Sequence, residues 1–443
     1  MVKYFGALSF IAYFAKKKLT MKKHSLFCGT ILILLSLRSC AWLDDGGILS
    51  RPRLETDPPA GEGKGTVQPS PKDSSLMVTV VEFPEGYCWQ RDSSGEAGGC
   101  LISLYCNGAR IVSVPSGAGY PACQAADMHR CIGGKLYTDY SSAYETSVYE
   151  NGNLLFSYEG REMICGFLIK DGSIYTLGQN RSGNGLSFRK NGMLLYSSAS
   201  GQVIGSADNP SGRTGALYED NGSIIFCFRS TSVTQGTAVT SCYIVRDGVP
   251  EKLSFPDNVK SVYDIRQING KIAAAVENVT ASKSPALIVD GSLKALPLSI
   301  SNIKIGSCRL CWYGDENIFL NVTFTQDGWK SLRSALVRRD GFKVLFKSGE
   351  SVSDFWIHGK DYACPVVIED RISLIYSIEG ERREVALEDG NYSLLSPSSM
   401  IFNGKSITAG LSPRDSAGFP IIVRGSRAEV LKVNGYVTSV GYY

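Results

Sequence analysis

Histidine is nearly absent from this chain of 443 residues, which contains three. Beyond the first forty residues only His129 and His358 remain, too few for a histidine metal cluster. A serine nucleophile would need one of them beside it, and the Gly-x-Ser-x-Gly turn that presents such a serine in many hydrolases does not occur. The sequence therefore predicts no catalytic residue and no metal site.

An excess of charge of one sign is also lacking. The chain has 46 Lys and Arg against 42 Asp and Glu, a formal net charge of +4, and its basic residues are scattered. Nucleic-acid-binding proteins ordinarily gather Lys and Arg into a basic patch, and this sequence shows none, so we expect no nucleic-acid partner. The glycine-rich stretch Gly61–Thr66 could suggest a phosphate site, but a glycine separates Lys64 from Thr66 and no strand precedes it. We predict no cofactor.

Two apolar runs lie within the first forty residues, and the second is too short to span a bilayer comfortably. It begins with basic residues after Met21 and continues through Leu37, as a secretory signal peptide does. The segment Leu37–Cys40 resembles a lipobox, in which a small residue precedes the cysteine that is acylated. We predict that residues 1–20 arise from an upstream start codon, that 21–39 are the signal peptide, and that Cys40 is lipidated.

Residues 40–76 form the next predicted unit, a lipidated start followed by a tether. The stretch 46–76 is rich in glycine and proline and shows no apolar period. About thirty residues of flexible coil reach on the order of 30 Å, enough to hold a folded body clear of a membrane. Asp44 and Asp45 follow Cys40 closely, and acidic residues there resemble the surface-export signals of Bacteroidetes-type lipoproteins.

From residue 77 to the end, two kinds of glycine turn alternate between β-rich runs. The first kind precedes an alternating strand, and its copies are Gly133-Gly134, Asp171-Gly172, Asn221-Gly222, Asn269-Gly270 and Asn403-Gly404, with degenerate copies at 315–318 and 359–362. The second kind joins two runs tightly, and its copies are Asn151-Gly152, Asn191-Gly192, Asp247-Gly248, Asp290-Gly291, Asp340-Gly341 and Arg424-Gly425. Asn-Gly and Asp-Gly tolerate the positive φ of a type I′ turn, so the pattern predicts antiparallel hairpins.

Each kind of turn recurs every roughly 40 to 50 residues, the spacing of a four-stranded propeller blade. One unit is predicted as strands over 261–268, 271–277, 285–289 and 292–298. We therefore predict an all-β fold over 77–443, a β-propeller of four-stranded antiparallel blades. About eight blades are expected, or seven if residues 77–130 are an insertion, and the strand 436–442 should complete the blade that 77–82 begins. Two other β architectures do not fit this spacing. A parallel β-helix repeats at shorter intervals, and a pair of β-sandwiches gives no reason for the same two glycine turns to recur.

Cysteine is abundant, with thirteen in the chain. Export would permit disulfides, and the pairs close enough in sequence are Cys88 with Cys100, Cys123 with Cys131, and Cys227 with Cys242. We expect Cys165 and Cys364 to be buried as small hydrophobes. Cys308 and Cys311 have the spacing of half a zinc site or of a redox pair, but no second half exists, so a strand with two core cysteines is favoured.

Aromatic side chains are the candidates for ligand contact, because the loops of a propeller surround a central depression. Trp312, Tyr313 and Trp356 lie just ahead of the turns of successive units, and Trp89 lies near a predicted strand end. Such rings can stack on sugars or apolar ligands. The alternative, which we favour, is packing between adjacent blades.

The leader, tether and repeats together resemble Bacteroidetes-type outer-membrane lipoproteins that carry a β-propeller domain. The resemblance implies a lipid anchor in the outer membrane, with display at the cell surface as a further expectation. We expect a monomeric, non-catalytic module that binds glycans or envelope proteins. The alternative is a propeller hydrolase or lyase acting on extracellular polysaccharide, which would need two carboxylates, or tyrosine with arginine, in one central pocket.

Overall fold

The computed structural model describes residues 75–83, 101–115, 129–141, 144–180, 185–204, 216–234, 237–278, 285–295, 303–313, 317–326, 331–338, 341, 343–346, 350–352, 355–368, 371–386, 399–413 and 419–442. All regular secondary structure in these ranges is β-strand. No helix in this part of the chain has the length and apolar character needed to cross a membrane.

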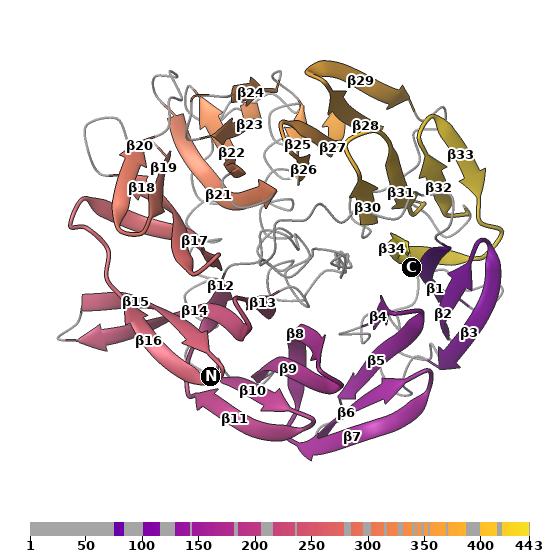
Figure 1. Ribbon diagram of the computed structural model, residues 1–443, viewed down its shortest axis with the longest axis horizontal. Coiled ribbons are helices and arrows are strands. Elements are labelled where there is room, and N and C mark those ends of the chain that lie inside the picture. The colour runs from indigo at the N-terminus through magenta and orange to yellow at the C-terminus, as the bar shows by residue number, and fades with distance from the viewer. Residues whose placement is uncertain are drawn as a thin grey trace, which may run out of the picture. The chain divides into compact units, whose positions relative to one another are not determined.

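The strands form eight antiparallel sheets, arranged as the blades of a ring (Figure 1). From the inner strand outward, the first three blades are β34 (Gly435–Tyr442), β1 (Leu76–Glu82), β2 (Leu101–Cys106) and β3 (Ala109–Pro115); β4 (His129–Ile132), β5 (Lys135–Ser141), β6 (Glu145–Glu150) and β7 (Asn153–Glu159); and β8 (Glu162–Lys170), β9 (Ser173–Asn180), β10 (Leu186–Lys190) and β11 (Met193–Ser198). The fourth blade has β12 (Gln202–Ile204) and β13 (Tyr218–Asp220), both paired with β14 (Ser223–Thr234), then β15 (Thr237–Arg246) and β16 (Val249–Leu253).

The fifth and sixth blades are β17 (Val259–Ile268), β18 (Lys271–Asn278), β19 (Pro285–Val289) and β20 (Ser292–Ala295); and β21 (Ile303–Tyr313), β22 (Asn317–Gln326), β23 (Ser331–Arg338) and β24 (Lys343–Leu345). The seventh has β25 (Ser351–Val352) and β26 (Trp356–His358) on β27 (Asp361–Ile368), then β28 (Arg371–Ile378) and β29 (Glu381–Ala386). The eighth is β30 (Ser399–Phe402), β31 (Ile407–Leu411), β32 (Ile421–Arg424) and β33 (Arg427–Val430).

The core is divided into eight apolar clusters, and each cluster lies between two adjacent blades. One cluster, for example, joins Leu287 of the fifth blade to Leu310 and Val322 of the sixth. A blade therefore buries apolar side chains on both faces and depends on both neighbours. The eighth blade packs on β34 of the first, which closes the ring and confirms the predicted eight-bladed propeller.

The ring is closed by pairing the last strand with the first. Strand β34 runs antiparallel to β1, with Leu76 opposite Tyr442 and Glu82 opposite Gly435. A register shift between Thr79 and Val80 interrupts this ladder. The prediction that residues 436–442 complete the blade begun by 77–82 is confirmed.

The predicted hairpin turns have the expected backbone. Asn151, Asn191, Asp247 and Asp290 adopt φ of 48–49°, and the glycine after each also has positive φ. Two turns of this kind that the sequence analysis did not include are Asn107-Gly108 and Glu379-Gly380.

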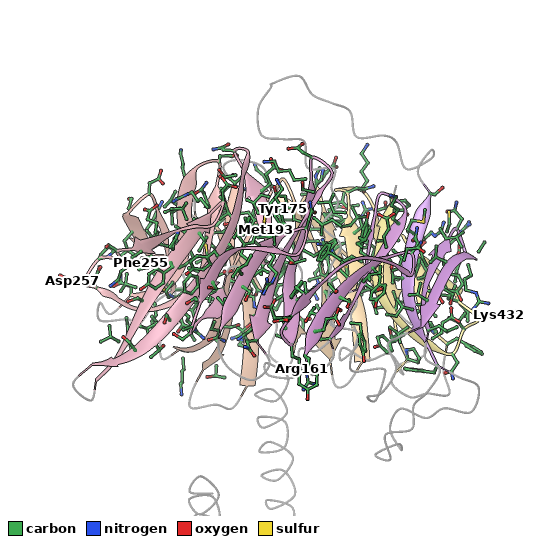
Figure 2. All side chains as sticks on the ribbon, turned by 90° about the horizontal axis from the view of Figure 1, so that it is seen from below. Arg161, Tyr175, Met193, Phe255, Asp257 and Lys432 are labelled. Carbon is green, nitrogen blue, oxygen red and sulfur yellow. The ribbon has the colours of Figure 1, made fainter. Side chains whose placement is uncertain are left out.

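These turns all lie at one end of the ring, here called the turn face, because antiparallel strands that are joined in pairs one–two and three–four return to the same end. The other connections start and end at the opposite end, the loop face. Figure 2 shows this polarity, with Tyr175 and Met193 at one end of the third blade and Arg161 at the other.

In five blades the asparagine or aspartate of the outer turn also bonds to the second strand of its own blade. Asn151 N–H donates to the carbonyl of Leu136 (2.7 Å), and Leu136 N–H donates to Asn151 Oδ1 (2.9 Å). This pair of bonds, here called the Asx clamp, recurs at Asn107, Asn191, Asp247 and Asp290. In the eighth blade Gly425 supplies the main-chain bond to Ile407, and glycine has no side chain to supply the second.

The inner strands of the fourth and seventh blades are each in two pieces, which the sequence analysis did not predict. In the fourth blade β12 ends at Ile204 and β13 begins at Tyr218. In the seventh, the gap between β25 and β26 lies opposite the stretch of β27 that contains Pro365. Proline has no N–H to donate, so a ladder is readily interrupted beside it.

Candidate functional site

The aromatic residues proposed for ligand contact lie partly at the turn face. Trp312 and Tyr313 end β21, and Trp356 begins β26, so the inner strands of two neighbouring blades carry them toward the same end of the ring. The Trp356 side chain is 9% exposed and packs with Met400 and Phe402 between the seventh and eighth blades. The side chains of Trp312 and Tyr313, and the whole of Trp89 and Cys40, are outside the described residues. Ligand contact by these residues stays a prediction.

The disulfide that the sequence allows between Cys227 and Cys242 is not formed. Both thiols are buried and free. The register explains this, because Cys227 lies opposite Ile244 and Cys242 lies opposite Arg229. Burial raises the pKa of the Cys227 thiol to about 12, which keeps it protonated and unreactive. Cys88, Cys100 and Cys123 are outside the described residues.

Cys308 and Cys311 lie in β21, as predicted, and both are buried. Positions three apart in a strand point to opposite faces. Cys308 accordingly packs against the fifth blade and Cys311 against the seventh. They cannot share a zinc ion or form a redox pair. Within the described ranges no three His, Cys, Asp or Glu side chains gather as a metal site would require.

His358 ends the inner strand β26 and packs on the eighth blade. Its ring meets Phe402 edge-on at 6.5 Å between centroids, and a Cβ added at Gly404 would contact its ring within 3.1 Å. Burial lowers the pKa of this imidazole, so the ring is neutral at pH 7. Of His129 the structure describes the backbone, which pairs with Thr138.

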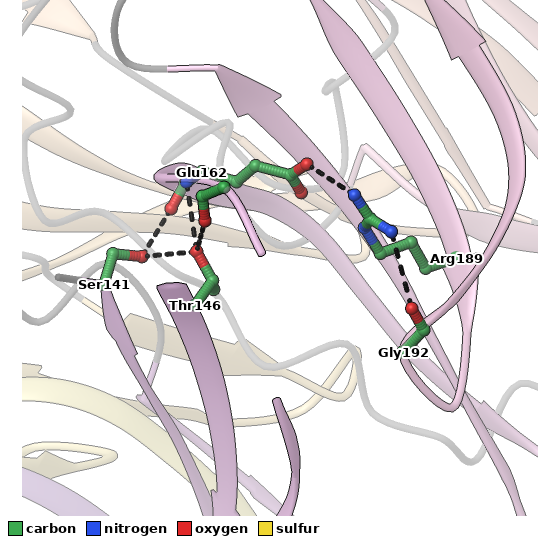
Figure 3. Close-up of polar contacts among 6 residues, drawn as sticks. Ser141, Thr146, Glu162, Arg189 and Gly192 are labelled. Carbon is green, nitrogen blue, oxygen red and sulfur yellow. Dashed lines mark hydrogen bonds and ion pairs between the residues drawn. The ribbon is translucent and has the colours of Figure 1, made fainter. Parts of the chain in front are cut away.

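A buried polar cluster lies between the second and third blades and extends from the start of β8, at the loop face, to the outer turn of the third blade (Figure 3). Arg189 donates to Glu162 Oε1 at 2.9 Å, and both side chains are largely buried. The main chain of Glu162 is held by the second blade: its N–H donates to Thr146 Oγ1 (3.0 Å), and Ser141 Oγ donates to its carbonyl (2.6 Å). Arg189 also donates to the carbonyl of Gly192. Further hydrogen bonds therefore fix both partners of the ion pair in place.

The second blade covers this ion pair with Tyr158. The Arg189 guanidinium lies 4.1 Å from the centroid of the Tyr158 ring. Burial, and then the negative charges of Glu162 and Asp139, raise the pKa of the Tyr158 phenol, so it stays neutral. Gly178 makes room for the carboxylate, because a Cβ there would collide with Glu162 Oε2.

A second buried cluster links the fourth and fifth blades. The Arg266 guanidinium lies 3.8 Å from the centroid of the Tyr218 ring, and Tyr218 Oη accepts from the N–H of Gln267 (2.9 Å). On the same inner strand, Asp264 Oδ2 accepts from the N–H of Leu310 in the sixth blade (2.9 Å). Asp264 and Arg266 are 3% and 1% exposed. Desolvation raises the pKa of Tyr218 well above its ordinary value.

Both clusters combine tyrosine, arginine and a carboxylate, the side chains expected of a carboxylate-dependent propeller enzyme. Here they face the neighbouring blade and are buried, so they bond to main chain and to each other. Arg130 of β4 behaves in the same way, since it donates to the carbonyl of Phe167 in β8 (2.8 Å). These groups hold blades together and are not presented to a substrate.

Sequence reasoning missed both clusters because no local signal marks them. Glu162 and Arg189 are 27 residues apart, and Tyr158 belongs to another blade. The pairing follows from the ring geometry, which fixes which strand faces which. The sequence does carry a local signal for another feature, the exposed leucines of two outer strands. Paired leucines follow Asn151-Gly152 and Asn191-Gly192, and consecutive apolar residues break the alternation expected of a strand.

No family model matches the sequence, and no curated protein matches it. Among solved structures, the chain is similar to apo AztD from Citrobacter koseri, with 12% identity, a TM-score of 0.48, and coverage of 83% of this chain and 98% of that one. It is also similar to the β-propeller domain of the trilobed protease from Pyrococcus furiosus, with 10% identity, a TM-score of 0.40, and coverage of 69% and 95%. Both likenesses are low, and the eight blades are established by the strand pairing of this chain itself.

Proposed function

We propose that this protein is a non-catalytic binding module of the cell envelope, anchored by lipid at Cys40, which recognises glycans or envelope proteins through a propeller face. The observation that carries the proposal is the packing of two polar clusters between blades, in which Glu162, Tyr218, Arg266 and Asp264 are buried and Tyr158 and Arg189 are partly buried. The ionisable groups best suited to chemistry are used to hold the ring, which leaves recognition by the faces as its role.

The loop face is the proposed recognition surface. Three of the longer connections of the chain, 83–100, 116–128 and 387–398, start and end at strand termini on this face. The first of them contains Trp89. Connections of this length on a rigid scaffold are where propellers and other β-folds carry binding residues.

Binding is tested with the full chain on glycan arrays and in pull-downs from the native envelope. The proposal predicts saturable binding that Trp89→Ala weakens, whereas Lys343→Ala, an exposed residue of β24 beside the outer turn at the turn face, leaves it unchanged. Release of sugars or unsaturated ends from a polysaccharide panel would instead favour the hydrolase or lyase. The lipid anchor is tested separately by mass spectrometry, which should find acyl chains on Cys40 and none after Cys40→Ala.

A further inference from the structure

The outer wall of the ring carries exposed apolar side chains on four consecutive blades. They are Ile111 of β3, Leu154 and Leu155 of β7, Met193, Leu194 and Leu195 of β11, and Val249 of β16, between 41% and 69% exposed. We call this set the outer belt. Each member lies within four residues of the outer turn of its blade, so all belong to the turn-face half of the wall.

The outer belt is continuous from blade to blade. A Cβ added at Gly192 of the third blade would contact the Phe156 ring of the second at 3.1 Å, and one at Gly248 would contact Leu195 within 3.6 Å. The outer turns of the third and fourth blades therefore rest on the outer strand of the preceding blade, as Gly152 of the second does on Val114 of the first. The strands β7 and β11 thus present their leucines side by side on one surface.

Three members of the belt are bulged residues at equivalent positions. In the first three blades the outer hairpin shifts register, leaving Ile111, Leu155 and Leu195 without a partner on the neighbouring strand. A bulge turns the extra side chain away from the ladder and spoils the edge for strand addition. A partner must therefore meet the belt through side chains rather than by extending the sheet.

The size and charge of the belt indicate what covers it. One partner can face two adjacent blades of the ring at once, and the five belt residues on β7 and β11 expose on the order of 500 Å², at the upper end of a patch on a monomer; two copies that bury it reach the ~1,000 Å² of a specific contact. Residues 153–158 and 193–198 contain no Asp, Glu, Lys or Arg. Two copies of such a surface meet without like-charge repulsion, whereas a surface that lies on lipid is ordinarily rich in Lys and Arg.

We propose that the part of the outer belt on β7 and β11 is the interface of a homodimer, in which two copies of this chain meet through these two blades around a two-fold axis. This state differs from the monomer expected from the sequence. It does not depend on the proposed binding function, because the belt is on the outer wall and the recognition surface is at the loop face.

Sedimentation equilibrium of the full chain tests the proposal. The wild type should have twice the mass of one chain at micromolar concentration, and Leu155→Lys with Leu195→Lys should raise the dissociation constant at least about 100-fold, as for the loss of two central anchors. The matched control is Val430→Lys on β33, an apolar residue 57% exposed on an outer strand outside the belt, which should dimerise as the wild type does.

Two results would overturn the proposal. One is a monomeric wild type across the concentration range. The other is a belt variant, still folded by thermal unfolding, that dimerises as tightly as the control. Flotation with phosphatidylcholine–phosphatidylglycerol vesicles is run alongside, and vesicle binding by a monomeric wild type that the belt substitutions abolish would assign the surface to lipid instead.

Discussion

At the scale of single residues, the Asx clamp explains why asparagine and aspartate, rather than glycine alone, occupy the outer turns. The residue must accept positive φ, and its side chain must also reach the N–H of the second strand. Asparagine and aspartate are the residues that combine both properties. The clamp therefore ties the outer hairpin to the middle of the blade.

The clamp can be separated from the turn by substitution at Asn151. Asn151→Gly keeps the backbone conformation but removes the acceptor, and should lower the free energy of unfolding by about 1 kcal/mol, the usual net value of one hydrogen bond. Asn151→Asp keeps both and should remain within about 0.5 kcal/mol of wild type. Urea denaturation measures both, and equal stability of the two variants would contradict the clamp.

The buried pair Glu162–Arg189 should show strong coupling. Glu162→Gln leaves the Arg189 charge buried without its partner, so we expect a loss of about 3 kcal/mol, and Arg189→Met should cost a similar amount. The double variant should cost clearly less than the sum, because neither charge is then left alone. Chemical denaturation of the four proteins gives the coupling energy. Additive losses would mean that the ion pair makes no contribution of its own.

At the scale of elements, the sequence predicted the hairpins well because their signals are local. The strand predicted over 285–289 matches β19, and those over 261–268 and 271–277 match β17 and β18 to within two residues. The interrupted inner strands were not predicted, since the repeat pattern gives the number of strands but not where one is split. The Cys227–Cys242 disulfide does not form, because the register of a hairpin, and not the length of its loop, decides which residues face each other.

The closing strand offers a test at this scale. A Cβ at Gly435 would collide with the carbonyl of Val81 on β1, which is main chain and cannot move aside cheaply. Gly435→Ala should therefore cost about 3 kcal/mol, as severe overpacking does. The control is Gly306→Ala in the inner strand β21, where a Cβ would meet only the Thr323 carbonyl, at 3.5 Å. Thermal unfolding of the two variants should differ clearly, and similar melting temperatures would contradict this reading of closure.

At the scale of the whole molecule, the ring is one cooperative unit, because each apolar cluster takes its side chains from two blades. The sequence predicted this mutual dependence from the repeat alone. It could not predict that buried ionisable groups would bridge the same interfaces, since residues such as Asp264 and Leu310 are 46 positions apart.

The buried thiols and phenols should make stability fall in alkali. Burial raises the pKa of Cys227 to about 12 and raises those of Cys308 and Tyr218 well above their ordinary values. The folded state keeps these protons while the unfolded state releases the thiol protons above about pH 8.5. The stability that these groups contribute is therefore fully present below that pH and decreases as the pH rises. For each thiol the free energy of unfolding falls by up to about 1.4 kcal/mol per pH unit. Urea midpoints from pH 7 to above pH 9 measure the slope.

The control for the alkaline slope is Cys227→Ala. The variant is less stable at every pH because it leaves a cavity, but its stability should decline less steeply above pH 8.5. An unchanged slope would mean that Cys227 is not among the groups that set the alkaline limit.

The position of β34 has a consequence for how the protein is made. Strand β34, which completes the first blade, is synthesised after every other strand of the ring, so the first blade lacks its inner strand until β34 has been made. Seven sheets can assemble early, but the circle stays open until the final strand arrives. A nascent chain in this state has an unpaired edge on β1 until β34 pairs with it, and such an edge is open to wrong strand pairing.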